Sequence, residues 1–345
     1  MKPLKYLTLL FFALAAIGAI FPGAYQALNT WKVLPDDYRY GDLYRLSNLP
    51  QFKELQTKCP HPVFTQKQNI SLYTIGDSFL EKERIDSLDF AVKKYHHIKR
   101  EAKEQIVLDT TLENVLLIEC IERHLREYFT KEITDYEVVK TIQPRIEIKI
   151  PEKKSIISSL FKTNSDIETY FDIGQIEQRF ENIFFNFNIP LLFKELKANF
   201  VYYFFKRTTG NAIVSENGKH LFYCFDTDTT KILNSSFSYL SDNEVDAMVL
   251  NINKSVEKYK KSGFKKVYIC IIPNKASILE PKRGKYNELI SRVQTNKNLK
   301  ASCVDIYSVY KNSSQNVYAL SDSHWNCEGR RLWLELVNNE LNKKP

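Results

Sequence analysis

The sequence predicts an α/β fold in which helices cover both faces of a parallel β-sheet. Several short runs are apolar at nearly every position, as in KVYICIIP at 266–273, and such runs are typical of strands buried on both faces. Amphipathic helical patterns fill several gaps between the runs, which is the alternation that builds parallel sheets. With 345 residues, of which 43% are hydrophobic, the chain can fill a substantial core.

Four segments are expected as strands and four as helices. The expected strands are 72–76, 114–119, 266–273 and 302–307. The expected helices are 80–96, 121–131, 243–261 and 327–342. The length is best accounted for by one domain that carries an insertion.

The N-terminus predicts a membrane anchor. Lys2 and Lys5 precede the uncharged run Tyr6–Phe21, which is a basic start followed by an apolar segment at the short end for a spanning helix. No small-x-small cleavage site follows, so an uncleaved anchor over 1–28 is favoured over a cleaved signal peptide. A buried first helix of a soluble protein is the remaining alternative. The lysines would keep the N-terminal end in the cytoplasm and place the rest of the chain outside.

The rest of the chain is expected in four parts. A polar, proline-containing linker over 29–70 leads to the first part of the α/β domain at 71–131, and the second part occupies 206–345. Between them, 132–205 is expected as an inserted helical segment with an aromatic run near its end. That run either forms the core of a cap subdomain or packs on the sheet or near the membrane.

Charge and composition exclude several functions. The net charge is +8, but Lys and Arg are scattered among Asp and Glu, a pattern that permits an anionic polymer or membrane as neighbour and does not point to nucleic acid. The six cysteines show no C-x-x-C spacing, so no structural metal site is expected. Their spacing leaves open whether Cys59, Cys303 or Cys327 form disulfides. With 10 glycines, a phosphate-cradling loop is not expected either, so we predict no cofactor.

Ser78 is the first candidate catalytic residue. It lies in SLYTIGDSFL at 71–80, where an expected strand leaves through Gly76 and turns into an expected helix. A Ser nucleophile is held exposed at such a turn. Ser78 and Glu81 also match a capping box, in which both side chains only satisfy the backbone at a helix start. These ten residues alone do not decide between the two interpretations.

Asp322 and His324 form the second half of the candidate site. They stand in ALSDSHWNCEGRRLW at 319–333, and in an extended segment their side chains leave the backbone on the same side. The carboxylate can then orient the imidazole. The alternative interpretation is that Asp322 or Ser323 only caps the start of the last helix. Both motifs follow expected strands, and parallel sheets bind ligands beyond the carboxyl ends of their strands. The pairing therefore favours serine catalysis.

The two motifs resemble those of a known family. IGDSF and DSHWN look like the nucleophile and Asp-x-His blocks of SGNH (GDSL-type) hydrolases, and more narrowly of the alginate O-acetyltransferase branch. The segments VLLIECIER (115–123), NGKHLFY (217–223) and PNKASI (273–278) are similar to further segments of that branch, but only the two blocks are specific. The resemblance implies a three-layer α/β/α flavodoxin-like domain and acyl chemistry on a glycan.

The chain departs from that branch in two ways. Ser78 precedes Asp322 and His324, which is the order of ordinary SGNH esterases and is permuted relative to the acetyltransferases. The usual G-x-N-D block, whose Asn donates to the oxyanion, is absent, and ECIER stands at the corresponding strand end. The second and third oxyanion donors are therefore not identified.

The expected function is a membrane-anchored, extracytoplasmic acyltransferase or esterase, in the periplasm or at the cell surface of a bacterium. Its partners would be a polysaccharide substrate and an acyl donor, for which a membrane-bound acyltransferase is one source. His324 would accept the Ser78 proton, Asp322 would orient His324, and the Ser78 N–H at the start of its helix would be the first oxyanion donor. A non-catalytic polysaccharide-binding or export-complex scaffold is the alternative.

Three further residues are candidates for oxyanion or substrate binding: Arg123, Lys275 and Asp77. Arg123 has an alternative structural role as an ion-pair partner of Glu119 or Glu122. Lys275 has two expected roles, since it can hold a substrate carboxylate or cap the loop after its strand.

Overall fold

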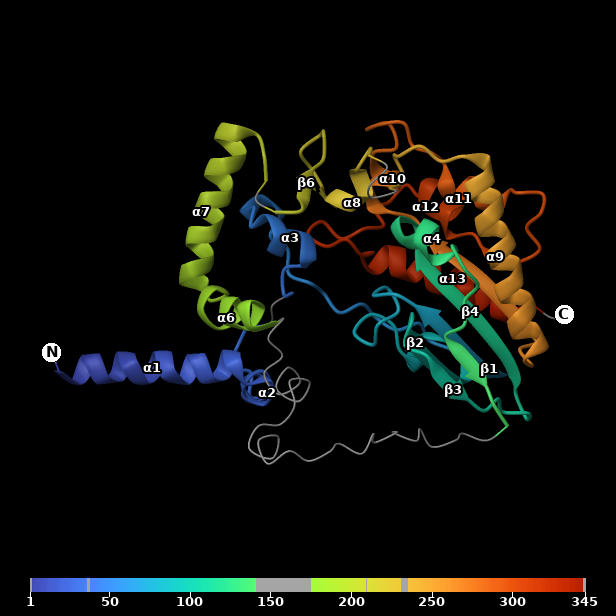
Figure 1. Cartoon of the computed structure of the whole chain (residues 1–345), viewed down its shortest axis with the longest axis horizontal. Helices are drawn as coiled ribbons and strands as arrows, with labels where there is room; N and C mark the ends of the chain where they lie inside the picture. The colour runs from blue at the N-terminus through green and yellow to red at the C-terminus, as the bar shows by residue number, and fades with distance from the viewer. Residues whose placement is uncertain (1, 36–37, 141–174, 209, 231–234, 344–345) are drawn as a thin grey trace, which may run out of the picture. The chain divides into compact units, whose positions relative to one another are not determined.

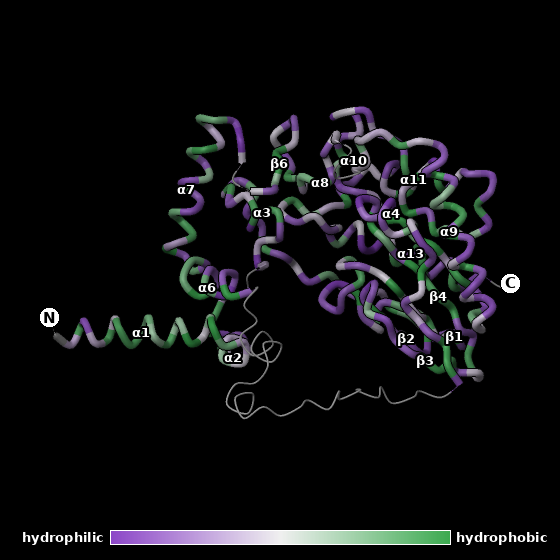
Figure 2. Tube along the Cα trace, in the orientation of Figure 1, coloured by the Kyte–Doolittle hydropathy of each residue, from purple (hydrophilic) through white to green (hydrophobic). Residues whose placement is uncertain are grey.

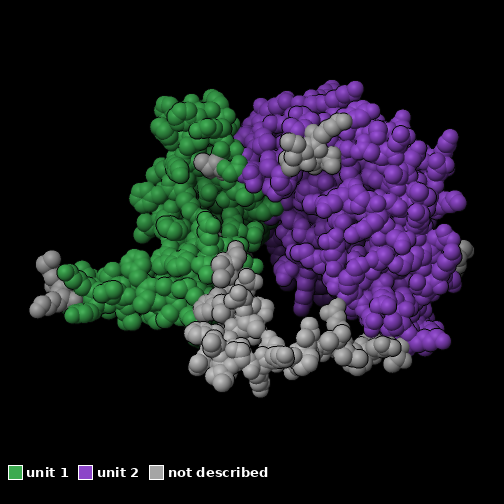
Figure 3. Space-filling model, in the orientation of Figure 1, with its two compact units in different colours: residues 1–56, 144–210 green, residues 57–143, 211–345 purple. Residues whose placement is uncertain are grey.

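The computed structural model describes residues 2–35, 38–140, 175–208, 210–230 and 235–343 (Figure 1). The chain divides into two compact units (Figure 3). Unit 1 comprises residues 1–56 and 144–210, and unit 2 comprises residues 57–143 and 211–345.

Unit 2 is built on a five-stranded parallel sheet with the order β2-β1-β4-β8-β9. In chain order this is 2-1-3-4-5, so the connections leave β1 and β4 in opposite directions. The strands are β1 (Gln68–Gly76), β2 (Val92–Lys99), β4 (Glu113–Ile121), β8 (Lys266–Ile272) and β9 (Ser302–Val304). The parallel α/β architecture expected from the sequence is therefore present.

Helices pack against both faces of this sheet because its central strands are apolar on both sides. One core contains Ile75, Ile118 and Ile269, and the core on the other face contains Leu72, Leu117 and Cys270. The first face is covered by α4 (Glu122–Tyr128), α9 (Asp242–Lys261) and α11 (Leu289–Gln294), and the second by α12 (Ile306–Lys311) and α13 (Cys327–Asn342).

Shorter elements complete unit 2. Two of them are strands of a second parallel pair, β3 (Glu104–Ile106) and β5 (Tyr136–Val138). A small hairpin is formed by β6 (Ala212–Val214) and β7 (Leu221–Tyr223), followed by α8 (Cys224–Thr227). The short helix α10 (Lys275–Leu279) begins three residues after β8.

The expected helix over 80–96 is wrong. This stretch contains only the 3-10 turn η2 (Ser87–Asp89), after which the chain enters β2. β2 pairs with β1 on one side only, and edge strands often carry lysines, as this one does at 93, 94 and 99. The lysines gave the segment a polar pattern that resembled an amphipathic helix. The strand expected at 302–307 is also shorter, because Asp305 accepts a hydrogen bond from the Ser308 N–H and starts α12.

The insertion begins later than expected. Residue 132 was its expected start, but Tyr136 of β5 belongs to the core of unit 2 and its hydroxyl donates to the Thr74 carbonyl of β1 at 3.2 Å. Residues 141–174 of the expected insertion lie outside the described residues. The expected linker over 29–70 is not a simple linker either. It contains α3 (Asp42–Ser47) and η1 (Pro50–Phe52), and β1 starts within it.

Unit 1 joins the N-terminus to the aromatic segment. It contains α1 (Lys2–Ile20), α2 (Pro22–Thr30), α6 (Ile176–Phe185) and α7 (Asn188–Phe205). α6 packs on α1, where the Phe184 ring contacts the rings of Phe11 and Phe12 and the Arg179 Nε donates to the Ala19 carbonyl at 2.6 Å. α1 is largely hydrophobic (Figure 2) and is long and apolar enough for a membrane anchor or a signal sequence.

Candidate active site

Ser78 lies in a turn directly beyond the carboxyl end of β1. The expected helix after Ser78 is absent, since residues 77–84 form turns and bends. The capping-box interpretation of Ser78 and Glu81 is therefore wrong, and so is the expectation that a helix N-terminus supports an oxyanion here. Within the described residues the Ser78 N–H makes no hydrogen bond to another residue. It remains available as an oxyanion donor without a helix dipole behind it.

Ser78, His324 and Asp322 form one hydrogen-bonded chain. The Ser78 Oγ lies 2.8 Å from the His324 Nε2, and the His324 Nδ1 lies 2.5 Å from the Asp322 Oδ1. The two segments are 246 residues apart in sequence. The expected contacts of Ser78 with His324 and of His324 with Asp322 are therefore present. An ionised Asp322 assigns the proton to Nδ1, which leaves Nε2 able to accept the proton of Ser78.

The environment of Asp322 keeps it ionised. Burial alone would raise the pKa of this carboxyl. The charge of His324, the hydrogen bonds that His324 donates to the carboxyl and the charge of Arg84 outweigh burial and hold the pKa of Asp322 well below its usual range. An ionised Asp322 can stabilise the imidazolium that forms when His324 takes a proton. The centroids of the Phe79 and His324 rings lie 4.6 Å apart, so Phe79 packs against one side of the imidazole.

Arg84 is a site residue that the sequence analysis missed. Its Nη2 lies 3.2 Å from the His324 Nδ1 and 4.0 Å from the Asp322 Oδ2. The His324 Nδ1 already carries the proton that it shares with Asp322, so Nδ1 and the Arg84 Nη2 are both hydrogen-bond donors and do not bond to each other. Arg84 is therefore attracted to the carboxylate of Asp322. Arg84 was not found because it falls in the segment that was expected to be helical, with no pattern linking it to residue 322.

Asp77 ties the nucleophile turn to the end of β4. Its Oδ1 accepts the Phe79 N–H at 3.0 Å, and its Oδ2 accepts the Ile121 N–H at 3.0 Å. Both oxygens of this carboxylate are engaged with the backbone, and a carboxylate has no donor for an oxyanion. The expected oxyanion or substrate role of Asp77 is therefore corrected to a positioning role.

Glu119 is a buried carboxyl beneath the same turn. Its Oε2 accepts the Asp77 N–H at 2.9 Å. Complete burial, and next the nearby Asp77 carboxylate, raise the pKa of Glu119 well above its usual range. A Cβ atom at Gly76 would lie 2.6 Å from that oxygen. Gly76 is thus required for the close approach of Glu119, which supports the turn in place of a helix.

Lys275 holds the loop that carries Asp322 and His324. Its side chain is fully buried, and its Nζ donates to the carbonyls of Ala319, Leu320 and Asp322 at 2.5, 3.1 and 3.2 Å. An ammonium that is surrounded by protein carbonyls below the surface is badly placed to meet a substrate carboxylate. Of the two expected roles, the structural one fits, although Lys275 holds the loop that carries Asp322 and His324 and not the loop after its own strand.

Arg123 is engaged in a structural ion pair, with a partner that was not expected. Its Nη1 lies 3.1 Å from the Oδ1 of Asp226, a fully buried residue of α8. Glu122, one of the expected partners, instead accepts hydrogen bonds from the Asn274 N–H and the Tyr286 hydroxyl. The ion pair with Asp226 joins α4 to α8, and we correct the oxyanion role of Arg123 accordingly.

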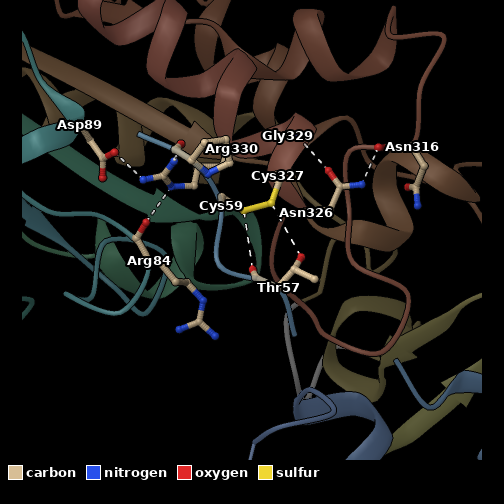
Figure 4. The surroundings of a disulfide bond; sticks show 10 residues. Thr57, Cys59, Arg84, Asp89, Asn316, Asn326, Cys327, Gly329 and Arg330 are labelled. Carbon is tan, nitrogen blue, oxygen red and sulfur yellow. Dashed lines mark hydrogen bonds and ion pairs between the residues drawn. A yellow bond between two sulfur atoms is a disulfide. The ribbon is translucent and has the colours of Figure 1, made fainter. Parts of the chain in front are cut away.

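A disulfide and an arginine fix the start of α13 (Figure 4). Cys59 is bonded to Cys327, the first residue of α13. Arg330, one turn later, donates to the carbonyls of Arg84 and Pro60 and pairs with the buried Asp89. Arg330 thereby links the helix after His324 to the segment that carries Arg84.

One cluster in unit 2 has the ligand types of a metal site. Atoms of His61, Asp86 and Asp89 lie close to one another. However, Asp89 is already neutralised by Arg330, and Asp86 accepts the Leu88 N–H and starts η2. These partners account for the cluster as an ion-pair and capping network.

Comparisons with protein-family models, curated proteins and solved structures give no match to this chain. Any functional statement therefore rests on the residues of this chain. What they place together is a Ser hydroxyl, an imidazole and a buried carboxylate in hydrogen-bonded order, beyond the carboxyl end of a parallel strand.

Proposed function

We propose that this protein is a membrane-anchored, extracytoplasmic serine acyltransferase or esterase of the SGNH type. The observation that carries the proposal is the chain Ser78–His324–Asp322, with its contacts of 2.8 and 2.5 Å. It is the arrangement that activates a Ser hydroxyl for acyl transfer. The strand order 2-1-3-4-5 is that of flavodoxin-like domains, and Ser78 follows β1 at the point where the connections diverge.

The reaction proceeds in two halves. The Ser78 Oγ attacks the carbonyl carbon of an ester while its proton passes to the His324 Nε2. The tetrahedral intermediate collapses, the ester C–O bond breaks, and the leaving alcohol departs with the proton from His324. In the second half, His324 deprotonates an acceptor hydroxyl, whose oxygen attacks the acyl carbon. The bond between that carbon and the Ser78 Oγ then breaks, and His324 returns the proton to Ser78.

The oxyanion of the intermediate requires at least one donor. The Ser78 N–H is the available backbone donor at the turn, since the neighbouring N–H groups of Asp77 and Phe79 are already bonded to Glu119 and Asp77. Preorganised N–H donors of this kind are typically worth about 3 kcal/mol each in transition-state stabilisation. A turn fixed by Asp77 and Glu119 supplies that preorganisation.

The extracytoplasmic location is supported by the disulfide and by the N-terminal helix. A disulfide such as Cys59–Cys327 persists in oxidising compartments and is rare in the cytosol. The basic start of α1 orients the following chain away from the cytoplasm. A polysaccharide acceptor is proposed from the resemblance of the two motifs to the alginate O-acetyltransferase branch.

The experiment that tests this function is incubation of the detergent-purified protein with an acetyl ester, with and without oligosaccharide acceptors. Acetylated sugar would identify a transferase, and free acetate alone would identify an esterase. If neither product forms, the protein is a non-catalytic scaffold and the proposal fails. Transfer and hydrolysis share the acyl-enzyme and differ in whether water is excluded from it.

A further inference from the structure

Helix α7 has an exposed face that is apolar from end to end. Its members are spaced by three or four residues, so they line one side of the helix. Each side chain is between 52% and 74% exposed: Ile189, Leu192, Phe193, Leu196, Phe200, Tyr203 and Phe204. The opposite side holds the buried residues Leu191 and Ala198. A helix of a soluble core packs its apolar face inward, whereas α7 exposes its apolar face.

The polar side of α7 is fixed to the rest of unit 1. Glu195 accepts hydrogen bonds from the Tyr44 hydroxyl at 2.5 Å and from the Lys53 Nζ at 2.7 Å. These contacts to α3 and to the residue after η1 set the rotation of α7. Its apolar face is therefore directed outward by specific polar contacts.

The contact between α1 and α6 links this part of unit 1 to the segment that can cross a membrane. Phe184 of α6 touches Phe11 and Phe12, which lie in the middle of the Pro3–Ile20 segment that can cross a membrane. If α1 spans, α6 cannot stand clear of the bilayer. In Figure 1, α7 runs across the direction of α1, α3 lies on one side of α7, and the N-terminal half of α1 projects away on the other side.

Charges near α7 fit the surface of a bilayer. Lys206 and Arg207 follow the helix, are exposed, and lie over the rings of Tyr203 and Phe205. Lys197 flanks the apolar face and is exposed. Basic residues beside aromatic and aliphatic ones are typical of helices that lie in the membrane interface, where the cations meet anionic headgroups. Lys194, Glu195 and Lys197 in the middle of α7 make a spanning position unfavourable.

We infer that the outer face of α7 inserts into the lipid bilayer, parallel to the membrane surface and beside α1. The protein then has two membrane contacts, one spanning helix and one interfacial helix. This inference does not depend on acyl chemistry. It concerns how unit 1 lies on the membrane, and it would hold equally for an enzyme or a scaffold.

The test places a reporter on each side of α7 in the full-length protein. Phe193→Trp adds a tryptophan on the apolar face, and Tyr202→Trp adds one on the opposite face. Each variant is reconstituted into phosphatidylcholine vesicles, with and without bromine atoms on the acyl chains. The emission of the parent protein, which contains three tryptophans, is subtracted. Both variants must retain the circular dichroism and unfolding temperature of the parent.

The inference predicts that brominated lipid causes a large loss of the added emission in Phe193→Trp and a much smaller loss in Tyr202→Trp. Equal, small losses in both variants would overturn it. Blue-shifted Phe193→Trp emission that bromine does not quench would also overturn it, because the face would then be covered by protein, such as a second copy of this chain. Activity is not a readout, so failure of the acyltransferase proposal cannot be confused with either outcome.

Discussion

Ser78 gains its proposed reactivity from a small number of neighbours. His324 accepts its proton, Asp322 fixes the ring, and Arg84 stabilises the carboxylate form of Asp322. Asp77 and Glu119 hold the turn from below. Carboxyl–backbone hydrogen bonds, and no helix N-terminus, therefore hold the turn that carries Ser78.

Ser78→Ala should abolish acyl turnover and leave the fold intact. The change removes one oxygen from a partly exposed residue that caps no helix, so the free energy of unfolding should change by less than about 0.5 kcal/mol. Loss of a nucleophile costs several orders of magnitude in rate. Ester turnover and chemical unfolding measure the two effects. Ser87→Ala, at an exposed residue of η2, is the matched control, and turnover by Ser78→Ala at the parent rate would exclude Ser78 as the nucleophile.

Glu119→Gln should change how stability depends on pH. Because the folded-state pKa of Glu119 is raised, the folded protein binds this proton more tightly than the unfolded chain, and stability falls as pH rises from the ordinary value of 4.5 through the folded-state pKa. Gln cannot ionise, so the variant should gain stability relative to the parent over that range, by up to about 1.4 kcal/mol per pH unit. Chemical unfolding at several pH values measures the difference, and a difference that is constant with pH would refute the raised pKa.

At the residue scale the sequence predicted the three residues of the proposed catalytic chain, but it did not predict the residues that support them. Ser78, Asp322 and His324 stand in short motifs with a chemical meaning of their own. Arg84 and Glu119 act through contacts that only the folded chain creates, and no local pattern marks them. Arg123 and Lys275 were candidates because they lie in segments, 115–123 and 273–278, that resemble segments of the acetyltransferase branch. Arg123 pairs with Asp226, and Lys275 binds the carbonyls of residues 319, 320 and 322. These partners are distant in sequence.

At the element scale, strands were predicted better than the segments between them. Continuous apolar runs identify β1, β4 and β8 because these strands are buried on both faces of the sheet. The polar edge strand β2 carries no such signal. Two elements matter most for the site, the turn after β1 and the start of α13, and each is fixed by contacts that are remote in sequence.

The disulfide should stabilise the start of α13 strongly. It joins residues with a sequence separation of 268, and removal of a native disulfide typically costs about 2–5 kcal/mol. We expect the Cys59→Ser, Cys327→Ser double variant to lose that amount of unfolding free energy. Cys303→Ser, at a cysteine that forms no disulfide, serves as the control. A double variant as stable as the parent would show that Arg330 and its partners suffice to hold the helix.

At the scale of the whole molecule, the pairing of the N-terminus with the aromatic segment was not predictable. The sequence showed that α1 and the run around α6 and α7 are both apolar, but periodicity within each segment carries no information on which of them pack together. The structure joins them in unit 1 through Phe184 and Arg179. For the same reason, periodicity alone did not predict that one face of α7 is exposed and apolar.

The N-terminal helix is predicted to remain on the mature protein. Its basic start, its uncharged apolar run and the lack of a cleavage site support retention, and α6 would lose its packing partner if α1 were removed. Mass spectrometry of the protein isolated from membranes measures the outcome. We expect an intact N-terminus, whereas a mature chain that begins near residue 25–30 would contradict the anchor and leave export unaffected.

The central claim is that Ser78 carries the acyl group, and trapping the acyl-enzyme tests it most directly. The protein is mixed with an activated acetyl ester, quenched in acid within the first turnover, and digested for peptide mass spectrometry. The account predicts one acetyl group on the peptide that contains Ser78, which is absent in Ser78→Ala and strongly reduced in His324→Ala. An acetyl group on another residue with Ser78 unmodified, or equal labelling of the peptide in the parent and in His324→Ala, would contradict it.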